Sequence, residues 1–104
     1  MDAETYLRLA DQALDRVARA LDVNEDLEVT RADGLVAIVF EDGTKYVLNR
    51  QSGAHQMWFA AAARAWHYDW EPTRETWVDD RDGHELWTRV GEVVAQKLGT
   101  PVSV

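Results

Sequence analysis

The chain has 104 residues, of which 46% are hydrophobic, and its formal net charge is −8 at pH 7. This length predicts one domain, residues 1–104, that buries roughly two thirds of the unfolded surface. The lack of cysteine excludes disulfides and thiolate metal ligands, and the negative charge argues against nucleic acid or an anionic membrane as a ligand.

The N-terminal residues, MDAETYLRLADQ, are acidic and amphipathic. A secretion signal has a basic start and an apolar run, whereas a transit peptide is arginine-rich and poor in acids. No apolar run in the chain approaches the roughly 20 residues that cross a bilayer. We therefore expect a soluble, cytoplasmic protein.

Apolar residues recur at spacings of three and four from Tyr6 to Leu21, which predicts an amphipathic helix over residues 3–22. Charged residues with the same spacing form a stripe on its other side. Residues 1–28 hold eight acidic residues against three arginines. The first helix and its surroundings therefore concentrate the negative charge.

Alternating apolar residues and turn residues predict strands over residues 27–30, 35–40, 44–51, 55–60, 66–70 and 75–79. Asp42-Gly43 is typical of a hairpin turn, and Ser52-Gly53 predicts another turn. The run MWFAAAARA from Met57 favours a helix by propensity. The flanking strand patterns favour instead a strand up to Ala60, followed by a loop.

A last helix is predicted from Glu85 to Leu98, with Asp80 or Asp82 as its cap and Gly99 at its end. Two helices cover only one face of such a sheet. We predict an α+β fold, a two-layer sandwich with the N- and C-terminal helices packed on one face of an antiparallel sheet of about six strands.

Strand alternation gathers polar and aromatic residues on the face of the sheet that the helices leave uncovered. This open face consists of Asn49, Gln51, Gln56, Trp58, His67 and Asp69. A tryptophan among amides is typical of a protein-binding hot spot. The alternative is a half-buried tryptophan on an ordinary wet surface.

The three histidines are expected to have different roles. His55, at a strand start, is expected to be structural or at the surface, and His84 to open the last helix. His67 is expected to join a protein contact, with metal ligation as the alternative.

A second candidate site, the acidic ridge, contains the carboxylates of the first helix, the turn after it and the next strand. Its residues are Asp11, Asp15, Asp22, Glu25, Asp26 and Glu28. Carboxylate oxygens select hard cations, but this spacing matches no preformed cage. We expect weak, hydrated binding of several cations, and pairing of Arg16 or Arg19 with the acids to weaken it further.

Several separated motifs follow one another in a fixed order along the chain. They are Arg8-Leu9-Ala10-Asp11-Gln12, Asn49-Arg50-Gln51, His55-Gln56 with Trp58, His67-Tyr68-Asp69, Trp77 and Asp80-Arg81-x-Gly83. Over essentially the whole chain this pattern resembles the frataxin family, most closely its bacterial CyaY type. The resemblance implies the frataxin fold and a role in iron–sulfur cluster assembly.

The resemblance also implies weak, surface-bound iron, Fe2+ or Fe3+, on the acidic ridge. It implies docking on the cysteine desulfurase and on the scaffold protein for iron–sulfur clusters, through the ridge and the exposed sheet. A regulatory monomer is expected, with iron-induced oligomers as an alternative. The ridge departs from the family pattern at Ala18, Arg19, Thr30 and Arg31, which places its iron binding in question.

Two other functions remain open at this stage. One is a protein adaptor without physiologically relevant iron binding, and the other is a ferroxidase-type protein that oxidises or stores iron. Acid–base catalysis needs carboxylates in a desolvated pocket, whereas these acids lie on a convex helix edge. We therefore expect the protein not to be an enzyme.

Overall fold

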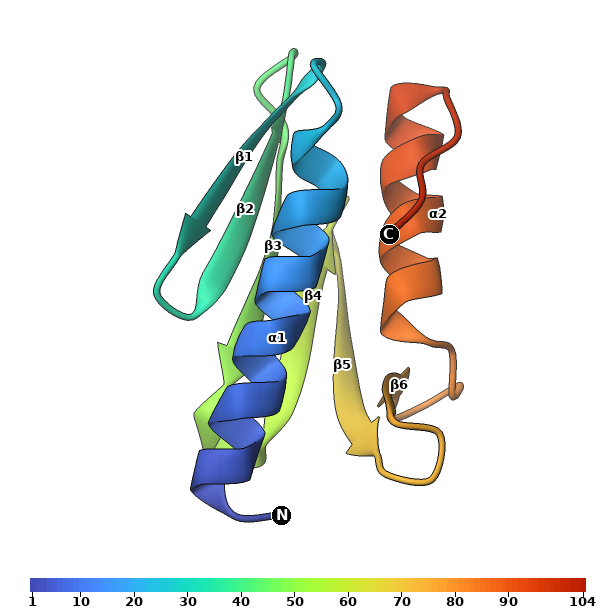
Figure 1. Cartoon of the computed structure of the whole chain (residues 1–104). Helices are drawn as coiled ribbons and strands as arrows, with labels where there is room; N and C mark the ends of the chain where they lie inside the picture. The colour runs from blue at the N-terminus through green and yellow to red at the C-terminus, as the bar shows by residue number, and fades with distance from the viewer.

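The computed structural model describes all 104 residues, and it has two layers, a pair of helices and a sheet (Figure 1). The elements are α1 (Ala3–Asp22), β1 (Leu27–Ala32), β2 (Leu35–Phe40), β3 (Lys45–Gln51), a 3-10 turn (Ser52–Ala54), β4 (Gln56–Ala61), β5 (Arg64–Glu71), β6 (Thr76–Asp79) and α2 (Leu86–Leu98). Both helices lie on the same face of the sheet (Figure 1). The predicted α+β sandwich is therefore confirmed. Neither helix combines the length and apolar character needed to cross a bilayer.

The sheet is a six-stranded antiparallel meander in the order β1 to β6, so every strand pairs with its neighbour in sequence. At the hairpin between β2 and β3, the Thr44 N–H donates to Asp42 Oδ1 at 2.9 Å, and Gly43 has a φ of +87°. Glycine adopts this left-handed backbone conformation at little cost because it has no Cβ. The Asp42-Gly43 pattern therefore marked this turn correctly.

The core lies between the helices and the sheet, as one cluster of 20 buried residues. From α1, the residues Tyr6, Ala10, Leu14, Val17 and Leu21 are at most 1% exposed. Their spacing of three or four places them on one side of the helix. Buried side chains of the strands meet them, because alternate residues of each strand point to the same face.

The largest difference from the predicted elements is the β4–β5 hairpin. The predicted loop after Ala60 is a two-residue turn, Ala62-Ala63, and β5 already begins at Arg64. Both turn residues have positive φ, 52° and 66°, as the central residues of a type I′ turn do. Cross-strand pairing from Gln56 to Ala61 outweighs the helix propensity of the alanines here.

The predicted cap of the last helix is wrong. α2 begins at Leu86, and Glu85 stands at the capping position without a side-chain capping bond. Asp82 instead accepts the His84 N–H at 2.9 Å and binds the Arg89 guanidinium at 2.7 Å. Its carboxylate therefore binds the loop and the Arg89 side chain of α2, and it accepts no N–H group of the first helical turn.

The C-terminal tail runs back along α2 and ends at the edge of α2 that faces α1 (Figure 1). A Cβ on Gly91 of α2 would lie 3.2 Å from the Val102 carbonyl oxygen, so the lack of a side chain at Gly91 lets the tail approach closely. The Arg16 guanidinium of α1 donates to the Val104 carbonyl at 3.2 Å. The tail thereby joins α2 to α1.

Candidate functional site: the open face and the acidic ridge

The structure brings all six residues of the open face together in two adjacent rows across β3, β4 and β5. One row is Asn49, Trp58 and His67, and the other is Gln51, Gln56 and Asp69. Met57 of β4 and Tyr68 of β5, which lie between the two rows along their strands, are fully buried on the helix side of the sheet. The open face is therefore a continuous surface on the layer opposite to α1 and α2.

Trp58 is half-buried and is held by two of its neighbours. Its indole stacks on the His67 imidazole, with ring centroids 4.3 Å apart and an interplanar angle of 16°. Its Nε1–H donates to Gln56 Oε1 at 3.0 Å. With its polar atom satisfied, the ring presents a rigid, largely apolar surface to a partner.

Gln56 connects this tryptophan to the acidic side of the open face. Its Nε2 donates to Asp69 Oδ1 and to Asp80 Oδ2, each at 3.0 Å. Asp80 follows β6 and joins the face through its N–H, which donates to the His67 carbonyl. The Asn49 side chain is turned back to the Arg50 carbonyl at 3.0 Å.

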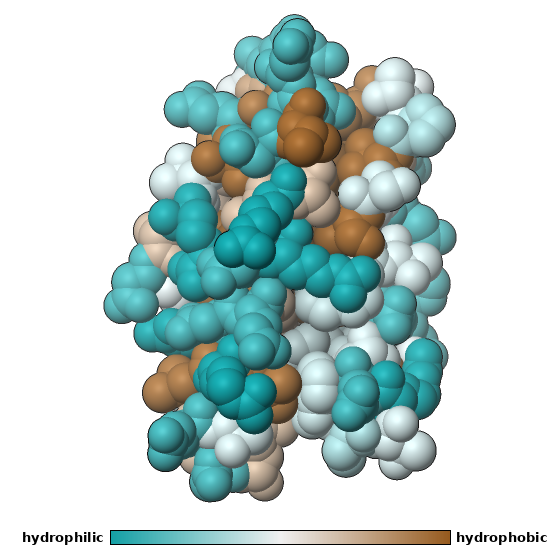
Figure 2. Space-filling model, in the orientation of Figure 1, coloured by the Kyte–Doolittle hydropathy of each residue, from teal (hydrophilic) through white to brown (hydrophobic).

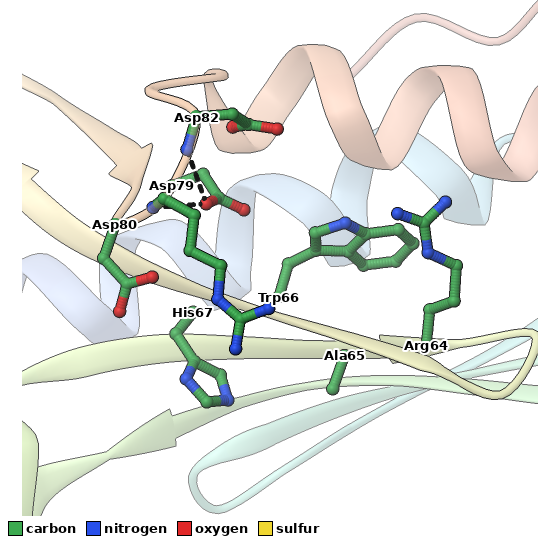
Figure 3. A pocket seen from close by; sticks show the side chains of 8 residues that line it. Arg64, Ala65, Trp66, His67, Asp79, Asp80 and Asp82 are labelled. Carbon is green, nitrogen blue, oxygen red and sulfur yellow. Dashed lines mark hydrogen bonds between the residues drawn. The ribbon is translucent and has the colours of Figure 1, made fainter.

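A hollow of about 310 Å³ opens beside His67, where β6 is too short to cover the first half of β5 (Figure 3). Within it Asp79 is 5% exposed and accepts the N–H groups of Arg81 at 2.8 Å and Asp82 at 3.2 Å. Arg89 approaches the same carboxylate at 3.5 Å. These bonds fix the loop that carries Asp80 to the open face.

The other two histidines lie away from this face. His55 stacks on Tyr6 of α1 with a centroid distance of 4.7 Å, in a left-handed conformation with φ 52°. His84 Nε2 lies 2.6 Å from Glu92 Oε1. These contacts assign His55 to the packing of α1 on the sheet and His84 to the start of α2.

The acidic ridge divides into two parts with different surroundings. At one end, Asp11 and Asp15 of α1 are half-exposed and both carry arginine partners. Arg31 of β1 reaches Asp15 at 3.0 Å and Asp11 at 3.6 Å. Arg50 of β3 reaches Asp11 at 2.9 Å and also binds Asp33 at 3.2 Å.

The other end is free of such pairs. Asp22 ends α1, Glu25 and Asp26 follow in the turn, and all three are exposed and without a salt bridge. Glu28 lies on the sheet face away from α1, because its neighbours Leu27 and Val29 face the helix. Hydrophilic side chains cover much of the outward side of α1 (Figure 2).

The chemistry of the ridge fits a hard cation, but its geometry does not form a metal centre. No group of three or more His, Cys, Asp or Glu residues is close enough to hold an ion. Any cation would therefore meet one or two carboxylates and keep most of its water. A shallow, weakly held ion is compatible with this arrangement, and a preformed cage is not.

The expected pairing of Arg16 or Arg19 with the ridge acids is wrong. Arg16 lies over the Trp87 ring, 4.2 Å from its centroid, and donates to the tail. Arg19 forms no salt bridge. Arg31 and Arg50, from strands far from Asp11 and Asp15 in sequence, take that place. The sequence shows that Arg31 reduces the density of acidic residues on the first strand. Its partners, however, follow only from the packing of β1 against α1.

The family model described as a frataxin-like domain matches residues 1–100. The iron-sulfur cluster assembly protein CyaY of Bordetella parapertussis is 35% identical over 111 residues, which cover 100% of this chain and 98% of that protein. The CyaY protein of Aeromonas hydrophila is 32% identical, with coverage of 98% and 97%.

Solved structures agree with this fold. The frataxin of Psychromonas ingrahamii, of the CyaY family, superposes with a TM-score of 0.90 at 28% identity, over 99% of this chain and 97% of that one. A trimeric yeast frataxin, determined in complex with ferrous iron, superposes with a TM-score of 0.67 at 24% identity, over 94% and 86%. The yeast protein supports the fold alone.

Proposed function

The chain belongs to the frataxin family, which takes part in iron–sulfur cluster assembly, and we propose that it is an accessory, regulatory protein of that process. In this role it docks on the cysteine desulfurase and its scaffold protein through the open face and the acidic ridge. It also carries iron weakly on the ridge. The role is regulatory and not enzymatic.

One observation carries the docking part of this proposal, namely the fixed position of Trp58. A half-buried aromatic ring at the surface that is already ordered loses little conformational entropy on binding. Its stack on His67 and its bond to Gln56 provide this order. The amides and carboxylates around it supply hydrogen bonds at the rim, as protein interfaces generally do.

The test is the affinity of the chain for the purified desulfurase–scaffold complex from the same organism, measured by biolayer interferometry. Trp58→Ala should weaken binding at least about tenfold, which is typical of a hot-spot residue. Leu7→Ala is the matched control, because Leu7 is a 38% exposed apolar residue on α1. Equal affinities of Trp58→Ala and the parent chain would remove the open face from the interface.

The iron part of the proposal rests on the exposed carboxylates at the free end of the ridge and on membership of the frataxin family, of which a yeast member was determined in complex with ferrous iron. Anaerobic titration with Fe2+ should give weak binding of low stoichiometry. The combined variant Asp22→Asn, Asp26→Asn and Glu28→Gln should abolish it. Unchanged binding in this variant would reject the ridge as the iron site.

A second candidate function, an adaptor without relevant iron binding, is favoured by the arginine pairs on Asp11 and Asp15 and by the lack of a cluster of three ligands. The two candidates differ in how partner binding responds to iron. An iron-dependent change in the affinity for the desulfurase, lost in the ridge variant, supports the first. An affinity for the desulfurase that does not change with iron supports the adaptor.

A ferroxidase would consume oxygen when ferrous iron is added, and our proposal expects the same rate as buffer alone. An oxygen electrode measures this directly. Faster uptake with the parent chain that disappears in the ridge variant would replace the regulatory role by an enzymatic one.

A further inference from the structure

Two arginines and two carboxylates meet in a hollow of about 230 Å³ between α1 and β1. It is lined by Asp15, Ala18, Arg19, Asp22, Val29 and Arg31. The hollow is the place where the helix edge and the first strand of the acidic ridge face each other. The side chains that fill this hollow therefore decide which carboxylates of the ridge a cation can contact.

Arg31 lies across this hollow from β1 to α1. Strand alternation turns it toward the helix, on the same side as Leu27 and Val29. Its Nε donates to Asp15 Oδ1 at 3.0 Å, its Nη2 lies 3.6 Å from Asp11 Oδ1, and its Nη1 donates to the Ala32 carbonyl. All three nitrogens of the guanidinium thus meet oxygens of the same chain.

We propose that Arg31 is a built-in counter-ion that occupies the position a metal cation or a partner's basic side chain would take at Asp15, while Arg50 pairs with Asp11. It thereby directs cation binding to the free end of the ridge, at Asp22, Glu25 and Asp26. This inference rests on the proposed function only in taking the ridge as the cation-binding surface.

The physical reason is competition for the same oxygens. A guanidinium keeps its charge throughout the physiological pH range, so it does not leave by deprotonation. An incoming cation must displace it and leave the arginine without its carboxylate partners. A half-exposed ion pair contributes up to about 1 kcal/mol, which corresponds to a penalty of about fivefold in cation affinity.

Arg19 provides a matched control for the loss of charge. It lines the same hollow and carries the same charge, but no carboxylate lies within salt-bridge distance of it. Replacing either arginine with glutamine changes the net charge equally. Only Arg31→Gln also frees the oxygens of Asp15.

The experiment uses Mn2+ as the probe, because it does not oxidise under these conditions and it broadens the NMR signals of nearby amides. We expect Arg31→Gln to bind Mn2+ about threefold to fivefold more tightly than Arg19→Gln, with new broadening centred on the amide of Asp15, since Arg50 still pairs with Asp11. Equal affinities of the two variants would overturn the inference. So would broadening confined to residues 22–28 in both, or no Mn2+ binding by Arg31→Gln.

A second pair of variants tests the same idea without altering an arginine. Asp15→Asn removes a carboxylate that Arg31 already neutralises, so it should leave the Mn2+ affinity of the chain within about twofold. Asp22→Asn removes an unpaired carboxylate and should weaken binding more. Equal weakening by both would contradict the inference. None of these results depends on the desulfurase, so a failure of the docking proposal is recognised separately.

Discussion

The indole of Trp58 lies on the imidazole of His67, and the two residues face each other directly across β4 and β5. Directly opposed side chains in an antiparallel sheet are the pairs whose contacts stabilise it most. Here the pair also sets the orientation of the ring at the centre of the open face. The stack therefore links the register of the sheet to the surface offered to a partner.

Replacing His67 with alanine should weaken binding to the desulfurase–scaffold complex about twofold to tenfold, because aromatic pairs contribute about 0.5–1.5 kcal/mol beyond their buried area. The effect should be smaller than that of Trp58→Ala, since the indole itself remains. Biolayer interferometry measures both. Gln96→Ala, an exposed change on α2, should have no effect, and equal losses in Gln96→Ala and His67→Ala would refute a specific role for the stack.

Removing the hydroxyl group from either of two buried tyrosines should change the stability of the chain, with opposite signs. The Tyr6 hydroxyl donates to the Gln56 carbonyl at 2.8 Å, whereas the Tyr68 hydroxyl is buried without a partner. Burial raises the pKa of both phenols. Tyr6→Phe should lower the free energy of unfolding by about 1 kcal/mol, because a hydrogen bond is lost.

Tyr68→Phe should instead raise the free energy of unfolding by up to about 1 kcal/mol, because an unpaired hydroxyl leaves the core. Urea denaturation at pH 7 measures both changes. Destabilisation by Tyr68→Phe comparable to that by Tyr6→Phe would show that the Tyr68 hydroxyl is satisfied.

The Ala62-Ala63 turn provides a third stability prediction. Both residues have positive φ, a conformation that costs alanine more than asparagine or glycine. The double change Ala62→Asn and Ala63→Gly should stabilise the chain by about 1 kcal/mol, which raises the melting temperature by about 4–8 °C in a domain of this size. The same pair of changes at Thr73 and Arg74, outside this turn, is the control, and an equal rise there would contradict the explanation.

The loop predicted after Ala60 was wrong, whereas the predicted open face was right. Alternation placed all six open-face residues correctly, because a strand has a period of two and the helices cover only one face. Propensity in the alanine run pointed to a helix or a long loop, since the pairing that extends β4 and β5 is not local. The prediction therefore ended β4 one residue too early, at Ala60, and began β5 two residues too late, at Trp66.

The acidic ridge was harder to predict for a related reason. The carboxylates of α1 were identified from their spacing, but the partners of Asp11 and Asp15 lie on β1 and β3. Arg16 and Arg19 were expected as partners instead, and Arg19 lies four residues after Asp15, at a spacing that makes neighbours on a helix. Only the packing of the sheet against α1 brings Arg31 and Arg50 to these acids.

The ion pair of Asp42 and Lys97 predicts a pH dependence of stability. Lys97 Nζ at the end of α2 donates to Asp42 Oδ2 in the β2–β3 turn at 2.5 Å. This bond, with the Thr44 N–H, holds the pKa of Asp42 well below its usual range, and the same pairing raises the pKa of Lys97. The contribution of Asp42 is thus present above its unfolded pKa of about 3.9 and is lost as the pH falls through its folded pKa.

The contribution of Lys97 has the opposite sign with pH. It is present below the unfolded pKa of about 10.4 and is lost as the pH rises through the folded pKa. Asp42→Asn should therefore lower the melting temperature most between about pH 4 and pH 10, and progressively less in stronger acid. Glu41→Gln, an exposed change without a salt bridge, controls for net charge. A pH-independent effect of Asp42→Asn would contradict a role for the ion pair.

The most direct test of the proposed role is the rate at which an iron–sulfur cluster forms on the scaffold protein in the presence of the desulfurase, cysteine and ferrous iron. The parent chain should change this rate, and Trp58→Ala should return it to the value without the chain, while Leu7→Ala acts as the parent does. A rate that the parent chain leaves unchanged, or that Trp58→Ala alters as much as the parent, would contradict the account.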